Sequence, residues 1–390
     1  MALKKETSQL LQLLEHASPA EAVLRAPTPD RGLADTVRFP FLAVVGQGEM
    51  KTALILALIN PHIGGVLLIG PRGTGKTTAV RGLVELLPTV QRSKCPLGCT
   101  PEAAEAGGTD AICPQCAQKL ARGEPLTAPD RMRLIELPIN ARLEDVVGGI
   151  NERLALEQHK VRLERGILSY ADQNLLYVDE VNLLDDVLAN AILDAAAQGY
   201  YTVRRGPLTN TYRARLTLIG SMNPEEGNLR PQIMDRFGLR VVVSGSVDVD
   251  ERLEVTRRVQ SFAANRYDFA ARFTDATLQT VDEIRTARNR LPHVTLTDAA
   301  ERIALQLVNE LKIQSLRAEI VTLQAARARA AADGRNTADV DDVVAVAPMA
   351  LRLRFSPFIA QYVEARQAEE SAIQQAIERL GMHSTAEEAQ

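Results

Sequence analysis

The sequence predicts an α/β fold in which helices flank a parallel sheet, followed by an all-α domain. Between Phe39 and Val243, apolar runs of strand length alternate with longer helical patterns, as expected when helices connect parallel strands. A glycine-rich loop joins one of these strands to a helix. Beyond Val243 only helical patterns continue, and the 390 residues are enough for two domains.

The elements are predicted from apolar periodicity and from capping signals. In the helical domain, Asp298 and Glu301 have the spacing of a capping box, and Gly334 ends a helix that starts near Leu316. In the α/β domain we expect helices at Glu49–Leu58, Thr77–Leu87 and Leu184–Gln198, and strands at Gly65–Ile69, Leu134–Leu137, Leu175–Val178 and Arg215–Gly220.

Four segments are expected along the chain. They are an N-terminal extension at residues 1–37, the α/β domain at 38–245, the helical domain at 246–365 and a polar helix or tail at 366–390.

Charge and hydropathy argue against several classes of protein. The net charge of −4 gives no overall positive field for nucleic acid or anionic lipid. The most apolar stretch, Thr52–Gly70, is interrupted by Asn60 and Pro61 and is therefore no membrane span. The N-terminus lacks the apolar core of a signal peptide. We expect a cytoplasmic protein.

The glycine-rich loop has the composition of a phosphate-binding loop. Its glycines let backbone amides turn toward phosphates, Lys76 would bridge the β- and γ-phosphates, and the Thr77 hydroxyl would bind Mg²⁺. The helix that follows favours anions at its N-terminus. The predicted ATP-binding residues are Gly70, Pro71, Arg72, Gly73, Thr74, Gly75, Lys76, Thr77 and Thr78.

An acidic pair ends the apolar run Leu175–Val178. Asp179 would complete the Mg²⁺ shell, and Glu180 would orient and polarise the attacking water. A solvated turn is the alternative for such a pair, but the phosphate-binding loop elsewhere in the chain favours the catalytic interpretation. The sequence therefore predicts ATP hydrolysis as well as ATP binding.

Two further polar residues follow the next predicted strand. Asn223 could contact the γ-phosphate and the lytic water, or it could cap a turn. Arg236 could stabilise transition-state charge on the nucleotide of a neighbouring subunit, or it could form a local ion pair.

All four cysteines lie within one short segment. Cys95, Cys99, Cys113 and Cys116 form two knuckles with the spacing C-x3-C and C-x2-C, inside an insertion at residues 92–120. Four thiolates can close a tetrahedral zinc site with no open position, so we expect structural Zn²⁺. An iron–sulfur cluster, a redox-sensitive dithiol and unligated cysteines are the alternatives.

Several runs together closely resemble the magnesium chelatase ATPase subunit I family of AAA+ ATPases. They begin at Phe39, Gly70, Leu176 and Asn223, and the resemblance covers residues 38 to 355. It implies a hexameric ring in which Asn223 is the first sensor, Arg236 the arginine finger and Arg317 the second sensor. The implied partners are a D subunit with an adhesion-type domain and a porphyrin-binding H subunit, which inserts Mg²⁺ into protoporphyrin IX for chlorophyll or bacteriochlorophyll.

The resemblance also implies two insertions that could move a partner. One is an insertion in the second helix at residues 138–165, and the other is a hairpin at 199–216 before the first sensor. Surface loops are the plain alternative for both.

Two other functions compete with the chelatase motor. One is a MoxR-like AAA+ chaperone that assembles a different metalloprotein, and the ATP site does not separate the two. The other is a nucleic-acid remodeller, in which hairpin arginines would contact phosphates. The acidic chain and its 4% aromatic content disfavour base stacking. The arginines concerned are Arg204, Arg205, Arg213 and Arg215.

Overall fold

In this computed structural model the described residues are 37–356, apart from 109–110, 151–162, 207 and 246–247, together with 370–373 and 375–377. The chain divides into two units, Met1–Val37 and Arg38–Gln390, and the described helices and strands belong to the second. The predicted extension lies outside the described residues except for Val37. So do most of the predicted tail and the middle of the 138–165 insertion.

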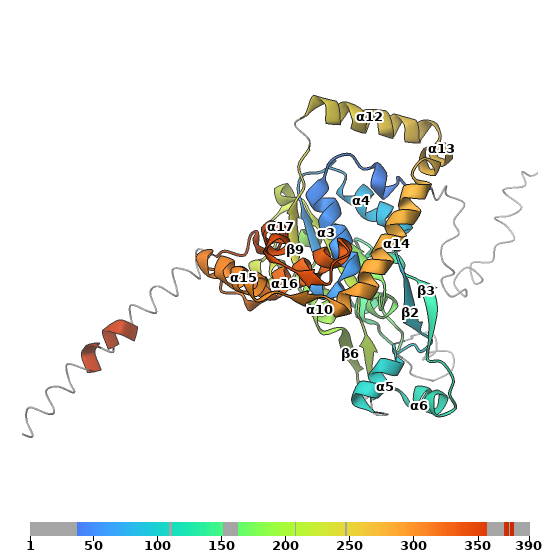
Figure 1. Cartoon of the computed structure of the whole chain (residues 1–390). Helices are drawn as coiled ribbons and strands as arrows, with labels where there is room; N and C mark the ends of the chain where they lie inside the picture. The colour runs from blue at the N-terminus through green and yellow to red at the C-terminus, as the bar shows by residue number, and fades with distance from the viewer. Residues whose placement is uncertain are drawn as a thin grey trace, which may run out of the picture. The chain divides into compact units, whose positions relative to one another are not determined.

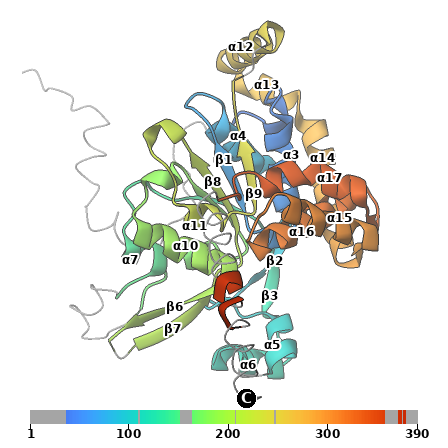
Figure 2. The same cartoon turned by 90° about the vertical axis from the view of Figure 1, so that its left-hand side faces the viewer.

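A five-stranded parallel sheet forms the centre of the α/β domain. Its strands are β1 (Val66–Ile69), β4 (Leu134–Glu136), β5 (Leu175–Val178), β8 (Thr217–Met222) and β9 (Leu239–Val242). Their order is β4-β5-β8-β1-β9, and Figure 2 labels β8, β1 and β9 of this sheet. Because all strands run in parallel, the loops after β1, β5 and β8 meet at one edge, where ligands bind in open α/β sheets.

Helices cover both faces of this sheet. Successive side chains of a strand point to opposite faces, so Val66 belongs to one apolar core and Leu67 to another. The first core includes buried residues of α3 (Gly48–Ile59) and α4 (Lys76–Gly82), and the second includes those of α10 (Asp186–Gln198). The predicted arrangement of a parallel sheet between helices is therefore confirmed.

The helix predicted at Thr77–Leu87 is shorter than expected. It ends at Gly82 and continues as a single 3-10 segment, η3 (Leu83–Leu86). Leu87 is extended because it precedes Pro88, whose ring disfavours helical backbone at the residue before it.

The second domain is a helical lid, as predicted. Its helices are α12 (Val249–Ala264), α13 (Arg266–Ala271), α14 (Thr274–Arg290), α15 (Asp298–Glu310), α16 (Leu316–Ala332) and α17 (Val340–Leu351). Two short strands, β10 (Thr295–Leu296) and β11 (Thr337–Ala338), pair in parallel within it. No signal for this pair was recognised in the sequence, since two residues are too few for an alternating pattern.

The predicted capping box at Asp298 is wrong by one residue. Thr297 is the N-cap of α15, and its side chain accepts a hydrogen bond from the backbone N–H of Ala300. The predicted end of α16 is confirmed, because Gly334 follows that helix with a positive φ of 78°.

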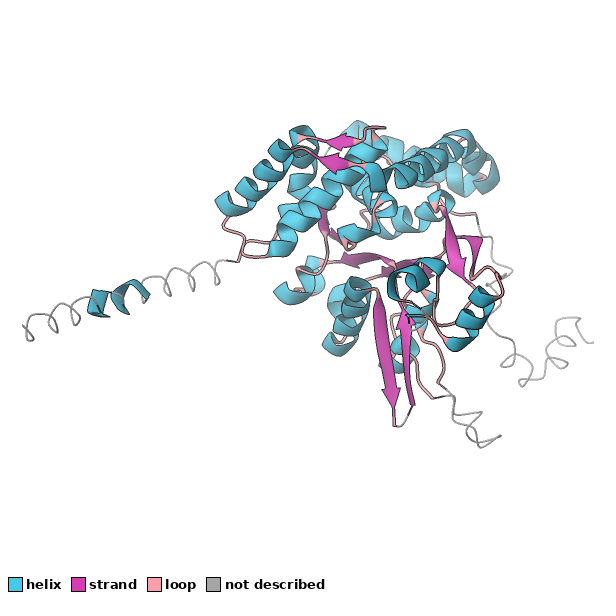
Figure 3. Ribbon diagram, turned by 60° about the horizontal axis from the view of Figure 1, so that its bottom comes forward, coloured by secondary structure: helices cyan, strands magenta, loops and turns pink. Residues whose placement is uncertain are grey.

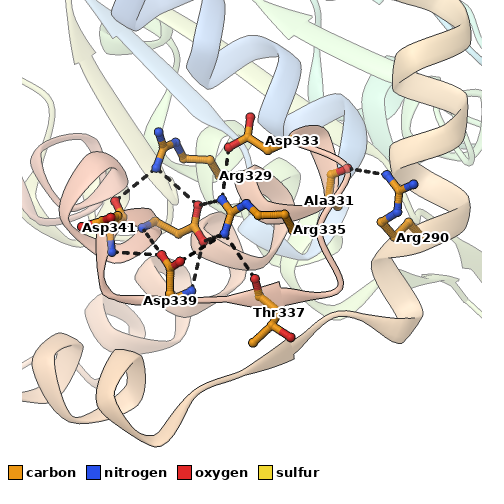
Figure 4. A network of polar contacts seen from close by, with 9 residues as sticks. Arg290, Arg329, Ala331, Asp333, Arg335, Thr337, Asp339 and Asp341 are labelled. Atoms are coloured by element: carbon orange, nitrogen blue, oxygen red, sulfur yellow. Dashed lines mark hydrogen bonds and ion pairs between the residues drawn. The ribbon is translucent and has the colours of Figure 1, made fainter.

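A buried carboxylate joins the last two helices of the lid. Figure 4 shows the polar network that includes Arg329 and Arg335. Asp342 of α17 is fully buried and accepts hydrogen bonds from Arg335 and from Arg329 of α16. Burial acts to raise the pKa of Asp342, but the hydrogen bonds from Arg335 and from the backbone N–H of Asp339 outweigh it and lower this pKa.

Two insertions lie toward the same end of the α/β domain in Figures 1 and 2. One is the predicted hairpin, formed by the antiparallel strands β6 (Tyr200–Arg205) and β7 (Leu208–Arg213), which Figure 3 shows as two long projecting strands. The other is the cysteine module, residues 94–126, between the paired strands β2 (Thr89–Ser93) and β3 (Thr127–Arg131). It contains the short helices α5 (Pro101–Gly107) and α6 (Pro114–Ala121).

Candidate active site

The phosphate-binding loop leaves the sheet at the end of β1 and runs into α4. Gly73 and Gly75 have φ values of 78° and 83°, which residues with a Cβ rarely adopt. Gly70 is required for a different reason, because a Cβ there would lie 1.9 Å from the carbonyl oxygen of Val243. Glycine is thus needed at each predicted position of the loop.

Lys76 is folded back onto its own loop. Its Nζ donates to the carbonyl oxygens of Gly70 at 2.7 Å and Pro71 at 2.8 Å. Burial lowers the pKa of Lys76, while the carboxylates of Asp179 and Glu226 act against this shift. The ammonium is held at the site and would exchange these carbonyl oxygens for phosphate oxygens.

The two predicted Mg²⁺ ligands are in contact. Thr77 Oγ1 lies 3.3 Å from Asp179 Oδ2, and hydroxyl and carboxylate oxygens suit a hard cation. Sequence reasoning did not identify Tyr177 and Ser221, which hold this pair. The Tyr177 hydroxyl lies 3.1 Å from Thr77 Oγ1 and 2.7 Å from Asp179 Oδ1, and Ser221 also donates to Asp179.

The burial of Tyr177 could have been expected from the sequence, because a strand of a parallel sheet covered on both faces buries all its residues, as β5 does. Burial also raises the pKa of its hydroxyl, which therefore stays protonated and can donate to Asp179.

Glu180 lies directly after Asp179 in left-handed backbone conformation, with φ 53°. Its N–H donates to Ser221 Oγ at 3.1 Å, which fixes this turn to β8. Its carboxylate lies 3.4 Å from Arg72, which also forms an ion pair of 2.5 Å with Glu226. Glu226 was not among the predicted site residues.

Most of the predicted ATP-site residues line one cavity of about 240 Å³. Its lining comprises the loop from Arg72 to Thr78, the pair Asp179 and Glu180, and the segment 221–223. Asn223 is buried in the wall, where its Oδ1 accepts from the N–H of Glu225. The structure therefore brings the phosphate-binding loop, the acidic pair and the predicted sensor asparagine into one cavity.

The four cysteines form a second cluster, away from this cavity. Their Sγ atoms all lie within 4.8 Å of one another, and those of Cys95 and Cys113 are 3.6 Å apart. Sulfurs around tetrahedral zinc at about 2.3 Å are about 3.8 Å apart, so the cluster has the size of a zinc site. Gly98 supplies a positive φ of 78° in the first knuckle, and Pro114 begins α6 in the second.

Comparison with known proteins identifies the family. A homologue of magnesium chelatase subunit ChlI from Methanocaldococcus jannaschii is 42% identical over 82% of this chain and 87% of its own length. The chain belongs to the magnesium chelatase subunit I family. The 38 kDa subunit of magnesium chelatase from Acidiphilium rubrum is also 42% identical, over 81% of this chain and 90% of its own.

Family profiles agree with this membership and with the AAA+ ATPase fold. The profile of magnesium chelatase subunit ChlI matches residues 40–121, that of the MCM P-loop domain residues 153–262, and that of the AAA lid domain residues 301–377. A solved structure from Cytophaga hutchinsonii is 20% identical over 86% of this chain and 91% of its own, with a TM-score of 0.51. Its likeness concerns the fold alone.

Two arginines to which the subunit I resemblance assigned roles lie outside the lining of the ATP cavity in the described part of the chain. Arg236 forms an ion pair of 2.7 Å with Asp194 of α10. Arg317, in the first turn of α16, donates to the carbonyl oxygen of Asp235 at 3.2 Å. Their roles as arginine finger and second sensor stay predictions, since either role needs a nucleotide or a neighbouring subunit.

In the part of the chain that the structure describes, no helix has the length and apolar content needed to cross a membrane.

Proposed function

We propose that this chain is the ATPase motor of a magnesium chelatase, in which ATP hydrolysis drives Mg²⁺ insertion into protoporphyrin IX on a partner subunit. The observation that carries the proposal is the single cavity shared by Lys76, Asp179 and Glu180 in a chain of the subunit I family. Mg²⁺ bound by Thr77 and Asp179 would neutralise phosphate charge, while Glu180 would orient the water.

The named relatives are described as subunits, which supports a chelatase made of several polypeptides. We propose two, a D subunit with an adhesion-type domain and an H subunit that binds the porphyrin, acting together in the cytoplasm. The test is reconstitution of the purified chain with D and H subunits, with ATP-dependent formation of Mg-porphyrin followed by absorbance. ATP hydrolysis without any Mg-porphyrin would favour instead a MoxR-like chaperone for another metalloprotein.

We propose that the chain forms a homo-oligomeric ring, expected to be a hexamer, because of where Arg236 lies. This side chain points to α10 of its own chain rather than into its own cavity, so a contact with nucleotide requires a neighbour. Inactive Arg236→Ala and Lys76→Ala chains should therefore regain partial ATPase activity when mixed, because some interfaces combine an intact finger with an intact loop. Mixtures as inactive as the separate variants would contradict the ring proposal.

Remodelling of nucleic acid is the less favoured function, although the MCM profile matches part of the chain. Two of the hairpin arginines that could bind phosphates are engaged within the protein. Arg213 donates to the carbonyl oxygen of Ala111, and Arg215 forms an ion pair with Asp172. ATPase rates measured with and without single-stranded DNA test this alternative, and we expect no stimulation.

For the cysteine cluster we propose one structural Zn²⁺ per chain. All four ligands come from the protein, so no position is open for chemistry. Metal analysis of protein purified without chelator tests the stoichiometry. A fully folded chain without metal would contradict the zinc proposal. Iron in place of zinc would support an iron–sulfur cluster instead.

A further inference from the structure

The cysteine module has a very small apolar core of its own. In the described part of the module the buried apolar residues are Cys99, Ile112, Cys116 and Leu126, and two of these are metal-ligand candidates. Such a core is too small to hold a segment of this length, whereas a structural metal supplies folding free energy directly. A metal bound by the four cysteines would therefore hold the shape of the module.

The first knuckle of the module is packed against strand β7 of the hairpin. The backbone N–H of Arg213 donates to the carbonyl oxygen of Leu97 at 3.4 Å, and the Leu97 side chain packs against a cluster that includes Val203 and Tyr212. A Cβ at Gly98 would lie 2.8 Å from the Cβ of Arg213, so this approach is as close as glycine allows.

The second knuckle is tied to the same strand. Arg213 Nη2 donates at 3.3 Å to the carbonyl oxygen of Ala111, two residues before the ligand candidate Cys113. Arg213 thus contacts both halves of the module, one through its backbone and one through its side chain.

A neighbouring arginine adds a further contact between the cysteine module and the base of the hairpin. We call these contacts the joint. Arg215 donates from Nη2 to the carbonyl oxygen of Gly98 at 3.2 Å, and its backbone N–H and Nε donate to the Asp172 carboxylate at 2.9 and 3.1 Å. A cavity of about 240 Å³ lies beside these contacts, lined in part by Cys95, Gly98 and Arg213. The joint is thus held by discrete polar contacts to the module and is only partly packed.

The joint continues directly into the ATP site. The chain passes from Arg213 through the buried Ala214 and Leu216 into β8. At the other end of β8, Ser221 contacts Asp179 and Glu180. The hairpin, the cysteine module and the catalytic carboxylates are therefore linked through one strand.

We propose that metal bound by the four cysteines anchors the base of the hairpin β6–β7 to the α/β domain, with Arg213 as the residue that transmits the anchoring. The inference rests on the zinc site proposed above and concerns the hairpin rather than the chelatase reaction. When the metal is lost, the two knuckles separate, Arg213 loses its carbonyl partners and the hairpin becomes mobile at its junction with β8.

Hydrogen exchange on the full chain tests this proposal. We compare zinc-loaded protein with protein stripped by chelator, and follow backbone amides at residues 200–213 alongside those of α17 in the lid. Removing zinc should raise exchange in the hairpin about tenfold or more and leave α17 unchanged, because loss of local anchoring lowers the free energy of local opening. Unchanged hairpin exchange after complete zinc removal would overturn the proposal.

A pair of hairpin variants separates anchoring from general loosening. Arg213→Gln should keep its zinc and show raised hairpin exchange while zinc is bound. Chelation should then raise exchange by less than in wild type, since only the contacts of the residue 213 backbone and of Arg215 remain to be lost. Arg204→Gln removes an exposed arginine of the same hairpin and should behave as wild type in both states. Wild-type exchange in zinc-loaded Arg213→Gln would refute the role of Arg213. Zinc content and hairpin exchange are both measured without porphyrin metallation. A failure of this proposal can therefore be distinguished from a failure of the chelatase proposal.

Discussion

The carboxylate of Asp235 in the α/β domain accepts a hydrogen bond of 3.0 Å from Ser315, which precedes the first helical residue of α16 in the lid. The same carboxylate pairs with Arg354 at 2.5 Å and with Arg240 at 3.4 Å, and both arginines are buried. Asp235 thus joins the two domains at the residue next to Arg236, the predicted arginine finger.

We predict that Asp235→Asn lowers the free energy of unfolding by about 3 kcal/mol, because it leaves two buried guanidinium groups without a carboxylate. Urea denaturation measures the change. Asp333→Asn is the matched control, since that carboxylate is half-exposed and pairs with a partly exposed arginine. A loss for Asp235→Asn no larger than that of the control would show that the buried arginines do not depend on this carboxylate.

Glu180→Gln should reduce the ATP hydrolysis rate by about 100-fold or more while leaving ATP binding intact, because an amide cannot polarise the attacking water. Phosphate release and nucleotide binding are measured on the same preparation. Glu225→Gln alters an exposed carboxylate nearby and should hydrolyse ATP normally. Near-normal turnover of Glu180→Gln would remove Glu180 from the catalytic role.

Tyr177→Phe should weaken the affinity for Mg²⁺ by about tenfold, because residues that orient metal ligands typically contribute 10–100-fold. The hydroxyl that this change removes contacts both Thr77 and Asp179. Titration of ATPase activity with Mg²⁺ measures the shift, and Tyr200→Phe on the exposed part of the hairpin is the control. An unchanged Mg²⁺ requirement would mean that the Tyr177 hydroxyl is dispensable for orienting the ligands.

The lid should lose stability in acid through Asp342. Its pKa is lowered in the folded state, so its contribution is fully present above the ordinary aspartate pKa of about 3.9 and is lost as the pH falls through the lower folded value. Unfolding measured by urea between pH 6 and about pH 3 should show a steeper loss for wild type than for Asp342→Asn. The exposed Asp341→Asn should follow wild type, and equal slopes for all three proteins would contradict this assignment.

The elements that carry ATP chemistry could be predicted because their residues are adjacent in sequence. Gly70 to Thr78 and the pair Asp179 and Glu180 are short runs at the ends of strands, and the parallel sheet brings them together. Tyr177 and Ser221 were missed because each supports Asp179 from within a strand, where it is indistinguishable from an ordinary core residue.

Contacts between segments that are distant in the sequence also could not be predicted. Nothing near Asp235 in the sequence indicates Ser315 or Arg354, and nothing near the cysteines indicates Arg213. Such pairs depend on how the lid and the insertions pack, which local periodicity does not encode. The cysteine spacing did predict a cluster, because both knuckles are local turns.

The two hydrogen bonds from Lys76 to its own loop have a consequence for how the site receives a nucleotide. An ammonium has three N–H donors, so one stays available to an incoming phosphate oxygen while the other two bond to the carbonyl oxygens of Gly70 and Pro71. A nucleoside triphosphate would also engage the amides of the loop, and its phosphate oxygens could then take over the N–H groups that the two carbonyl oxygens hold. The two carbonyl bonds therefore keep Lys76 beside the loop, in place for a ligand that reaches both the loop amides and the ammonium.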